Sequence, residues 1–242
     1  MNVAILFGRK NSRSIKNKNI LKIFSKPMYA YPIDAAKKIK KIKKIYVSSD
    51  SDVILKGSLK RGCQIIKRPK YLCTDKALLE DTIQHAVNYC QKVNNNKIKN
   101  FIILLCNSIC VDSKDLAKAL NMIETDKSID GVTTISKFNM YSPVRAKKVK
   151  GKYLLNYIPN KALLRYTPLS CDRDKSVHSY YCTQSFTISR ANVLKNMKYN
   201  PFPFNWMGKK MRYIEQESCV GDIDFPWQLE ATKLWVKNNK KK

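Results

Sequence analysis

The sequence predicts an α/β fold in which helices cover both faces of a mostly parallel, doubly wound, Rossmann-like sheet. Short apolar runs bounded by turn residues alternate with amphipathic segments of helical period along the first 135 residues. Most of these runs lack the polar–apolar alternation of a strand with one solvent-exposed face. Continuous apolar runs are typical of strands buried on both faces. The two observations together predict repeated βαβ units.

The first expected strand covers residues 3–7 and ends at Gly8. The first helix is expected over residues 27–41, because Pro27 suits a first helical turn and apolar residues follow at helical spacing. In such a fold the carboxyl ends of the strands meet at one edge, where ligands bind. The same patterns predict further strands at 45–48, 63–66, 101–105 and 131–135, and further helices after the Ser-Asp-Ser-Asp cluster at 49–52, at 78–89 and at 113–123.

The alternation stops between residues 139 and 175, where the chain is aromatic and basic and has no regular period. We interpret residues 139–175 as an excursion from a single domain of residues 1–242, not as a second domain. Strand character returns at residues 180–190, and the final helix is expected to open near Pro226.

The formal net charge of +29 in 242 residues raises nucleic-acid binding as a rival function from a different class. The lysines are spread along the whole chain, however, and no zinc-finger spacing or RNA-recognition aromatic motif accompanies them. A lysine-rich composition of the source proteome would give the same balance. We therefore expect no specific nucleic-acid partner.

The eight cysteines include no Cys-x-x-Cys pair, and several lie in apolar runs. In a chain of this size such cysteines are expected to be reduced and mostly buried. The sequence starts without the pattern of a secretory signal, and no apolar run approaches membrane-spanning length. These features predict a cytoplasmic protein with no membrane partner.

The loop after the first strand is dense in cations and hydrogen-bond donors. Five of the eleven residues from 9 to 19 are Arg or Lys, and all but one of the others are Ser or Asn. Charge-assisted hydrogen bonds to phosphate oxygens are strong, so this composition suits a nucleoside triphosphate. The composition alone leaves a solvated basic turn as the alternative.

Asp222-Ile223-Asp224 is the second segment with a chemical signature. Two carboxylates two residues apart on an extended segment point to the same side, while Ile223 points to the other. Mg²⁺ prefers one or two carboxylates together with phosphate oxygens and waters. The alternative is that Asp224 caps the helix that begins two residues later.

Residues 8–19 resemble the signature loop of the acylneuraminate cytidylyltransferase family, which is roughly Ala-Arg-x-x-Ser-Lys-Gly-hydrophobic-Pro-x-Lys-Asn. Two departures affect its backbone path, because Ser14 replaces a Gly and Lys16 replaces a Pro. The positions that match are Arg9, Ser12, Ile15, Lys18 and Asn19, with Arg13 in place of a Lys.

Further segments extend the resemblance over most of the chain. Val47-Ser48-Ser49-Asp50 is similar to the family's Val-Ser-Thr-Asp, and Arg68-Pro69 with Thr74-Asp75-x-Ala77 is similar to its Arg-Pro…Ser-Asp-x-Ala. Asp222-Ile223-Asp224 resembles the segment that holds the family's catalytic metal.

The resemblance implies transfer of CMP from CTP to an acidic, sialic-acid-like 2-keto-3-deoxy sugar, with release of pyrophosphate. Alternative acceptors are Kdo-, legionaminate- or pseudaminate-like sugars. It also implies a homodimer packed through the excursion and Mg²⁺ held by Asp222 and Asp224. The catalytic roles fall on Arg9, Arg13, Lys18, Asp222 and Asp224, and the nucleotide contacts on Gly8, Arg9, Ser12, Arg13, Lys18, Asn19, Arg68 and Asp75.

The resemblance is weakest at the acceptor site. Cys106 stands where sialic acid members have a Gln, and Cys182 where they have an Arg. A thiol is a weak donor and cannot replace a guanidinium on a carboxylate. We therefore expect N-acetylneuraminate itself to be a poor substrate. The expected acceptor contacts are Asn107, Arg165 and Gln184, and the cations available for a sugar carboxylate are Arg145, Lys147, Lys148 and Arg165.

Overall fold

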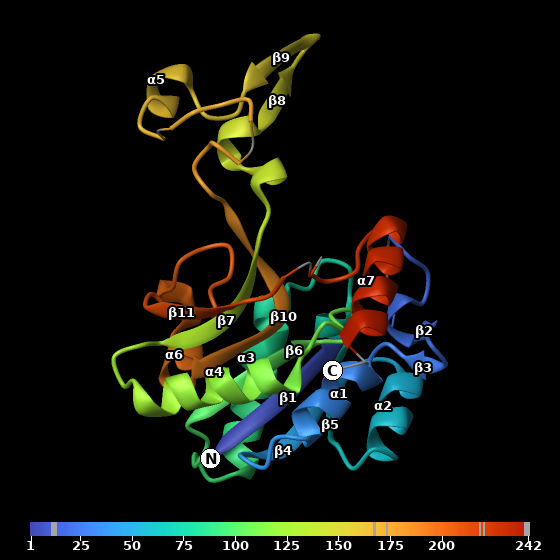
Figure 1. Cartoon of the computed structure of the whole chain (residues 1–242). Coiled ribbons are helices and arrows are strands. Elements are labelled where there is room, and N and C mark those ends of the chain that lie inside the picture. Colours follow the sequence, from blue (N-terminus) through green and yellow to red (C-terminus); the bar gives the residue numbers. More distant parts are fainter. Residues whose placement is uncertain (11–13, 167, 173, 218, 220, 240–242) are drawn as a thin grey trace.

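The computed structural model describes residues 1–10, 14–166, 168–172, 174–217, 219 and 221–239 (Figure 1). A seven-stranded sheet in the order β11-β7-β10-β6-β1-β4-β5 forms the centre of the molecule. β10 is antiparallel to β6 and β7, and the other pairs are parallel, so the predicted mostly parallel α/β sheet is confirmed. The strands are β1 (Asn2–Gly8), β4 (Ile42–Ser49), β5 (Gln64–Lys67), β6 (Asn100–Leu105), β7 (Gly131–Lys137), β10 (Tyr180–Arg190) and β11 (Met211–Glu215).

β1 is buried along its whole length and lies between β4 and β6. Ala4 and Leu6 belong to the core on one face of the sheet, and Val3, Ile5 and Phe7 to the core on the other. Both faces of β1 are buried, which explains the continuous apolar run at residues 3–7 of the sequence. Parallel pairing also brings the carboxyl ends of the three strands together.

Helices cover both faces of the sheet, as a doubly wound fold requires. α1 (Ala30–Lys37), α2 (Asp52–Leu59) and α4 (Ser113–Thr125) pack on the face that carries Leu6. α3 (Leu79–Val93) and α6 (Ala191–Lys195) pack on the face that carries Phe7. The last helix, α7 (Pro226–Asn239), lies beside the β2–β3 hairpin (Figure 1) and shares a third core cluster with Ile23 and Met28.

The start of the first predicted helix was wrong. Pro27 lies in β3 (Lys26–Pro27), which pairs antiparallel with β2 (Lys22–Ile23), and α1 begins only at Ala30. The hairpin turns at Phe24 and Ser25, both of which have positive φ. The sequence there lacks the Gly or Asn that is typical of such a turn.

β11 was not anticipated from the sequence either. Ile214 is its only buried residue, and the strand lies at the edge of the sheet beside β7. An edge strand that buries so little apolar surface leaves a weak periodic signal.

The described residues of the segment 139–175 extend away from the body above the ends of β7 and β10 (Figure 1), and we call this segment the arm. Two of its strands pair with each other as a separate antiparallel sheet. Its elements are η3 (Asn139–Tyr141), η4 (Pro143–Arg145), β8 (Lys147–Lys150), β9 (Tyr153–Asn156) and α5 (Asn160–Leu163).

Five of the eight cysteines are buried, which confirms the prediction that they are mostly buried, and none is bonded to another cysteine in the structure. Within the described ranges, no helix combines the length and the apolar character needed to cross a membrane.

Candidate active site

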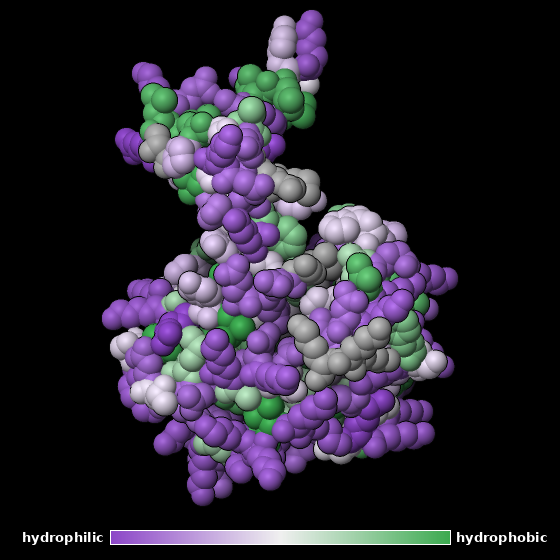
Figure 2. Space-filling view, viewed as in Figure 1, coloured by the Kyte–Doolittle hydropathy of each residue, from purple (hydrophilic) through white to green (hydrophobic). Residues whose placement is uncertain are grey.

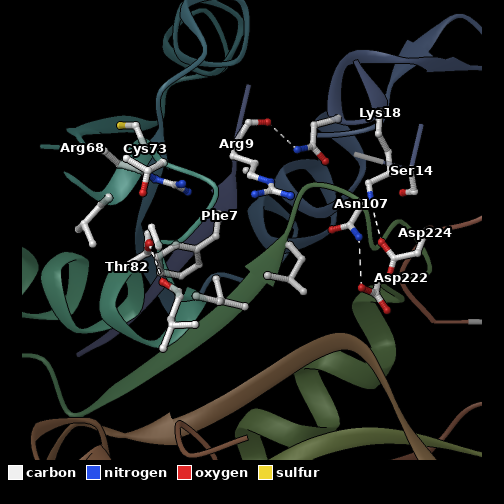
Figure 3. A pocket seen from close by; sticks show the side chains of 18 residues that line it. Phe7, Arg9, Ser14, Lys18, Arg68, Cys73, Thr82, Asn107, Asp222 and Asp224 are labelled. Atoms are coloured by element: carbon white, nitrogen blue, oxygen red, sulfur yellow. Dashed lines mark hydrogen bonds and ion pairs between the residues drawn. The ribbon is translucent and has the colours of Figure 1, made fainter. Parts of the chain in front are cut away.

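A cavity of about 350 Å³ opens at the carboxyl ends of β1 and β6 (Figure 3). Phe7 and Gly8 enter it from β1, Leu105 from β6, and Arg68 from the segment after β5. Figure 3 shows Arg68 and Cys73 at one end, the two aspartates at the other, and Arg9 between them. The cavity therefore has one end that holds the guanidinium of Arg68 and another, which we call the charged end, that holds the two carboxylates.

Gly8 is required by a close approach between two strand ends. A Cβ atom at this position would lie 2.3 Å from Cys106 Sγ and 2.9 Å from Cys106 Cβ. Cys106 is fully buried, and this burial raises the pKa of its thiol to about 12. Its side chain packs beneath Gly8 and does not line the cavity.

Two cations of the first loop line the cavity, and each is paired with an acid. Arg9 Nη1 lies 3.3 Å from Asp75 Oδ1, and Lys18 Nζ lies 2.6 Å from Asp224 Oδ1. Lys18 is the first residue of the short helix η1 (Lys18–Ile20), and its side chain is only 8 % exposed. Of the loop cations that the structure describes, Lys18 thus presents its charge inward, whereas Arg9 is 40% exposed.

Asn19 is buried, lines the cavity and offers a hydrogen-bond acceptor to a ligand. Its Nδ2 donates to the carbonyl oxygen of Arg9 at 2.9 Å, which fixes the orientation of the amide. Its Oδ1 is buried and has no hydrogen-bond partner among the residues that the structure describes. Buried polar atoms are normally satisfied, so this oxygen suits a donor group brought by a ligand.

Asp222 and Asp224 both line the cavity, while Ile223 between them is fully buried in the core. This is the alternation predicted from the sequence. Asn107 Nδ2 donates to Asp222 Oδ2 at 3.2 Å. Burial, and secondly the charge of Asp224, raises the pKa of Asp222 above its usual value.

The side chain of Gln228 caps the amino end of α7. Its Oε1 accepts hydrogen bonds from the backbone N–H groups of Asp224 at 2.8 Å and Phe225 at 2.7 Å. A Gln in the first turn that reaches back in this way satisfies donors that the helix leaves unpaired. The Asp224 carboxylate instead pairs with Lys18.

The two carboxylates fit a Mg²⁺ ion that completes its coordination with phosphate oxygens and waters. Among the described residues, no group of three or more His, Cys, Asp or Glu side chains forms a metal site made of protein alone. A site of two carboxylates beside a cavity lined by cations therefore suits an ion that binds together with a phosphate-bearing ligand.

Arg68 is anchored at the other end of the cavity. Its Nε donates to Ser48 Oγ at 3.0 Å and its Nη2 to the Ser48 carbonyl oxygen at 2.7 Å, and burial lowers its pKa. Leu72, Leu79 and Leu105 line the same cavity. An anchored guanidinium beside apolar side chains suits a flat heterocycle.

The cavity gathers many of the residues singled out from the sequence: Gly8, Arg9, Lys18, Asn19, Arg68, Asn107, Asp222 and Asp224. Asp75 joins the site through Arg9. Gln184 and Arg165 are not among its lining residues, and Arg165 is exposed on the arm. Ser12 and Arg13 lie outside the described residues.

Several apolar and neutral lining residues were not predicted, among them Leu72, Cys73 and Thr82. They carry no charge and no motif of their own. Leu72 and Cys73 lie on η2 (Lys70–Cys73), between Arg68-Pro69 and Thr74-Asp75, and this position between two matched motifs was the one available signal.

The sequence model of the family described as Cytidylyltransferase matches residues 3–216, which is most of the chain. The chain belongs to the cytidylyltransferase family. The match ends before Asp222 and Asp224, so the assignment of the chain to this family does not depend on the carboxylate pair.

Curated relatives of this chain include an N-acylneuraminate cytidylyltransferase of Escherichia coli, 28% identical over 99% of the chain and 53% of the relative. A flagellin modification protein B of Campylobacter coli is 30% identical over 95% of the chain and 92% of the relative. A two-function Helicobacter pylori protein, named for a pseudaminic acid cytidylyltransferase and a hydrolase, is 32% identical over 60% of the chain and 27% of the relative. The chain thus spans about half of the E. coli protein and about a quarter of the H. pylori protein.

The fold of this chain is also found in solved structures. A CMP:2-keto-3-deoxy-manno-octonic acid synthetase, solved with CTP, superposes with a TM-score of 0.68 at 16% identity and covers 98% of this chain and 99% of that one. A 4-diphosphocytidyl-2C-methyl-D-erythritol synthase superposes with a TM-score of 0.65 at 11% identity, covering 97% of each chain.

Proposed function

We propose that this cytidylyltransferase transfers CMP from CTP to an acidic 2-keto-3-deoxy sugar and releases pyrophosphate. The observation that carries the proposal is the order of groups along one cavity. Arg68 lies at one end of the cavity, Arg9 lies in the middle, and Lys18 lies at the other end together with the carboxylates of Asp222 and Asp224. This order matches the base, the phosphates and the reaction centre of a nucleoside triphosphate.

The end of the cavity at Arg68 would hold the cytidine. Leu72 and Leu79 offer apolar contact to the ring, and Arg68 is held in place by Ser48. The buried Oδ1 of Asn19 can accept a hydrogen bond from an amino or hydroxyl group of the nucleoside. A hydrogen-bond acceptor held rigidly in this way favours a ligand that carries a hydrogen-bond donor at the matching position.

The charged end would hold the triphosphate and favour displacement at the α-phosphorus. Arg9 and Lys18 offer charge-assisted hydrogen bonds to the phosphate oxygens and to the leaving pyrophosphate. Asp222 and Asp224 would hold Mg²⁺, which when bound neutralises phosphate charge and orients the reacting groups. The cavity would position the acceptor hydroxyl in line with the bond to pyrophosphate, and this positioning is the main source of rate.

We infer that the acceptor is an acidic sugar. The names of the relatives concern N-acylneuraminate and pseudaminic acid, which are both acidic sugars. Arg145, Lys147, Lys148 and Arg165 belong to the arm, which extends away from the body (Figure 1), and none of them lines the cavity. We propose that the arm of a second subunit brings such cations to the sugar carboxylate.

The surface of the arm supports a homodimer. Figure 2 shows hydrophobic residues gathered on it, and Val149, Leu154 and Leu164 are 77%, 67% and 74% exposed. Exposed apolar groups in such number mark an interaction surface. Sedimentation of the wild-type chain and of a variant with Val149, Leu154 and Leu164 changed to Ser tests the dimer, which the variant should lose. A wild-type chain that stays monomeric at enzyme concentrations contradicts it.

We further propose a cytoplasmic location, because eight free thiols suit a reducing compartment.

The function itself is tested by pyrophosphate release from CTP and Mg²⁺ with a panel of acidic 2-keto sugars. Release that depends on the sugar, with formation of a CMP-sugar, is the expected result. No release with any member of the panel contradicts the proposed function.

A further inference from the structure

The ion pair between Lys18 and Asp224 joins the cation that we propose to bind phosphate to a carboxylate that we propose to bind metal. Lys18 Nζ lies 2.6 Å from Asp224 Oδ1, and the two side chains are 8% and 49% exposed. A nearly buried ammonium distinguishes this pair from an ordinary surface ion pair, which solvent screens. A divalent ion at the same carboxylate would stand next to the ammonium, and like charges at such a distance repel.

Both residues are held through their backbones. The Lys18 N–H donates to the Ile15 carbonyl oxygen at 3.2 Å, and the Lys18 carbonyl oxygen accepts from the Leu21 N–H at 3.1 Å. The Asp224 N–H donates to Gln228 Oε1 at 2.8 Å. The exchange of partners at this site must therefore occur through the side chains, while the two backbones stay in place.

The neighbouring carboxylate has a different partner. Asp222 Oδ2 accepts a hydrogen bond from the neutral amide of Asn107 at 3.2 Å. A neutral amide orients a carboxylate without competing with a metal ion for its charge. Of the two carboxylates, Asp224 is thus the one whose charge a protein cation already balances.

We propose, on the basis of the function proposed above, that Lys18 is an internal counter-ion that keeps divalent metal from Asp224 until nucleotide phosphates are present. Metal alone would take the carboxylate from a buried ammonium, and a buried charge left without its partner is unfavourable. The phosphates of CTP give Lys18 a new partner, which releases Asp224 for the metal. The chain thus binds its metal together with the nucleotide and not before it.

The experiment is a titration of the nucleotide-free protein with Mn²⁺, in which electron paramagnetic resonance measures the free ion. The proteins compared are the wild type, Lys18→Met, Lys18→Arg and Lys16→Met. Lys16 is the matched control, because it is an exposed lysine of the same loop and its replacement removes the same charge. The double variant Asp222→Asn/Asp224→Asn gives the baseline for Mn²⁺ bound elsewhere.

Removal of the counter-ion should expose the metal site. Lys18→Met is expected to bind Mn²⁺ about ten-fold tighter than the wild type, within the usual range of coupling between sites. Lys18→Arg and Lys16→Met are expected to stay within about two-fold of the wild type, because the first keeps the charge and the second removes a screened one. Thermal unfolding checks that each variant is folded, and Lys18→Gln replaces Lys18→Met if the latter is not.

Equal Mn²⁺ affinity of the wild type and Lys18→Met would overturn the proposal. Equal tightening in Lys16→Met would also overturn it, because the effect would then come from net charge and not from the pair. The outcome is independent of the enzymatic test. CMP transfer with equal Mn²⁺ affinities contradicts the counter-ion alone, whereas the expected Mn²⁺ pattern without CMP transfer contradicts the proposed function alone.

Discussion

The contact between Gly8 and Cys106 gives a prediction that the structure allows us to quantify. In Gly8→Ala the new Cβ would lie 2.3 Å from Cys106 Sγ, so one of two fully packed strand ends must move. Overpacking of this kind costs about 1–3 kcal/mol, and the reduced entropy of the unfolded chain offsets roughly 0.4–1 kcal/mol of it. We expect Gly8→Ala to lower the free energy of unfolding by about 1–2 kcal/mol.

A second substitution should relieve the clash. Cys106→Gly alone removes a buried side chain and leaves a void, at a cost of roughly 2 kcal/mol. In the double variant Gly8→Ala/Cys106→Gly the alanine methyl group occupies the space that the thiol leaves. The double variant is therefore expected to be more stable than the sum of the two single effects by about 1–2 kcal/mol, a coupling typical of residues in contact.

Urea unfolding of the four proteins, followed by circular dichroism, measures this coupling. Gly131 provides the control, because a Cβ there would lie 2.3 Å from the backbone oxygen of Ile188, which Cys106→Gly cannot relieve. Gly131→Ala combined with Cys106→Gly should be additive. Additivity of Gly8→Ala and Cys106→Gly to within about 0.5 kcal/mol would refute the packing argument.

Three further predictions concern the reaction. Asp222→Asn and Asp224→Asn should each lower turnover by orders of magnitude in a folded protein, and near-normal kcat at saturating Mg²⁺ in both would contradict the metal assignment. Arg9→Ala should weaken CTP binding by roughly 1.5–3 kcal/mol, about 10- to 150-fold, through loss of a charge-assisted bond; calorimetry that gives an unchanged affinity would make the first loop a solvated turn. N-acetylneuraminate should be a poorer acceptor by kcat/KM than a related acidic sugar, because Cys106 is buried under Gly8 and offers the acceptor no donor; its ranking as the best acceptor would contradict this expectation.

Elements with a strong local signal were predicted well. Residues 180–190 were expected to be a strand and form β10 (Tyr180–Arg190), and the helix expected to open near Pro226 is α7 (Pro226–Asn239). The errors fall where local signal and tertiary contact differ. Pro27 was assigned to a helix because proline suits a first turn, but pairing of β3 with β2 places it in a hairpin. β11 buries one residue at the sheet edge and left no readable pattern.

The sequence by itself determined the buried strands, the basic loop after β1 and the side on which the Asp222 and Asp224 carboxylates lie. Each of these follows from residue types a few positions apart, because strand periodicity and local charge are short-range properties. Only the tertiary structure decided which of these residues contact each other. Lys18 and Asp224 are 206 residues apart in the chain, and Gly8 meets Cys106 because parallel pairing sets the ends of β1 and β6 side by side. Such contacts depend on how the whole sheet is assembled, and no local pattern of the sequence contains that information.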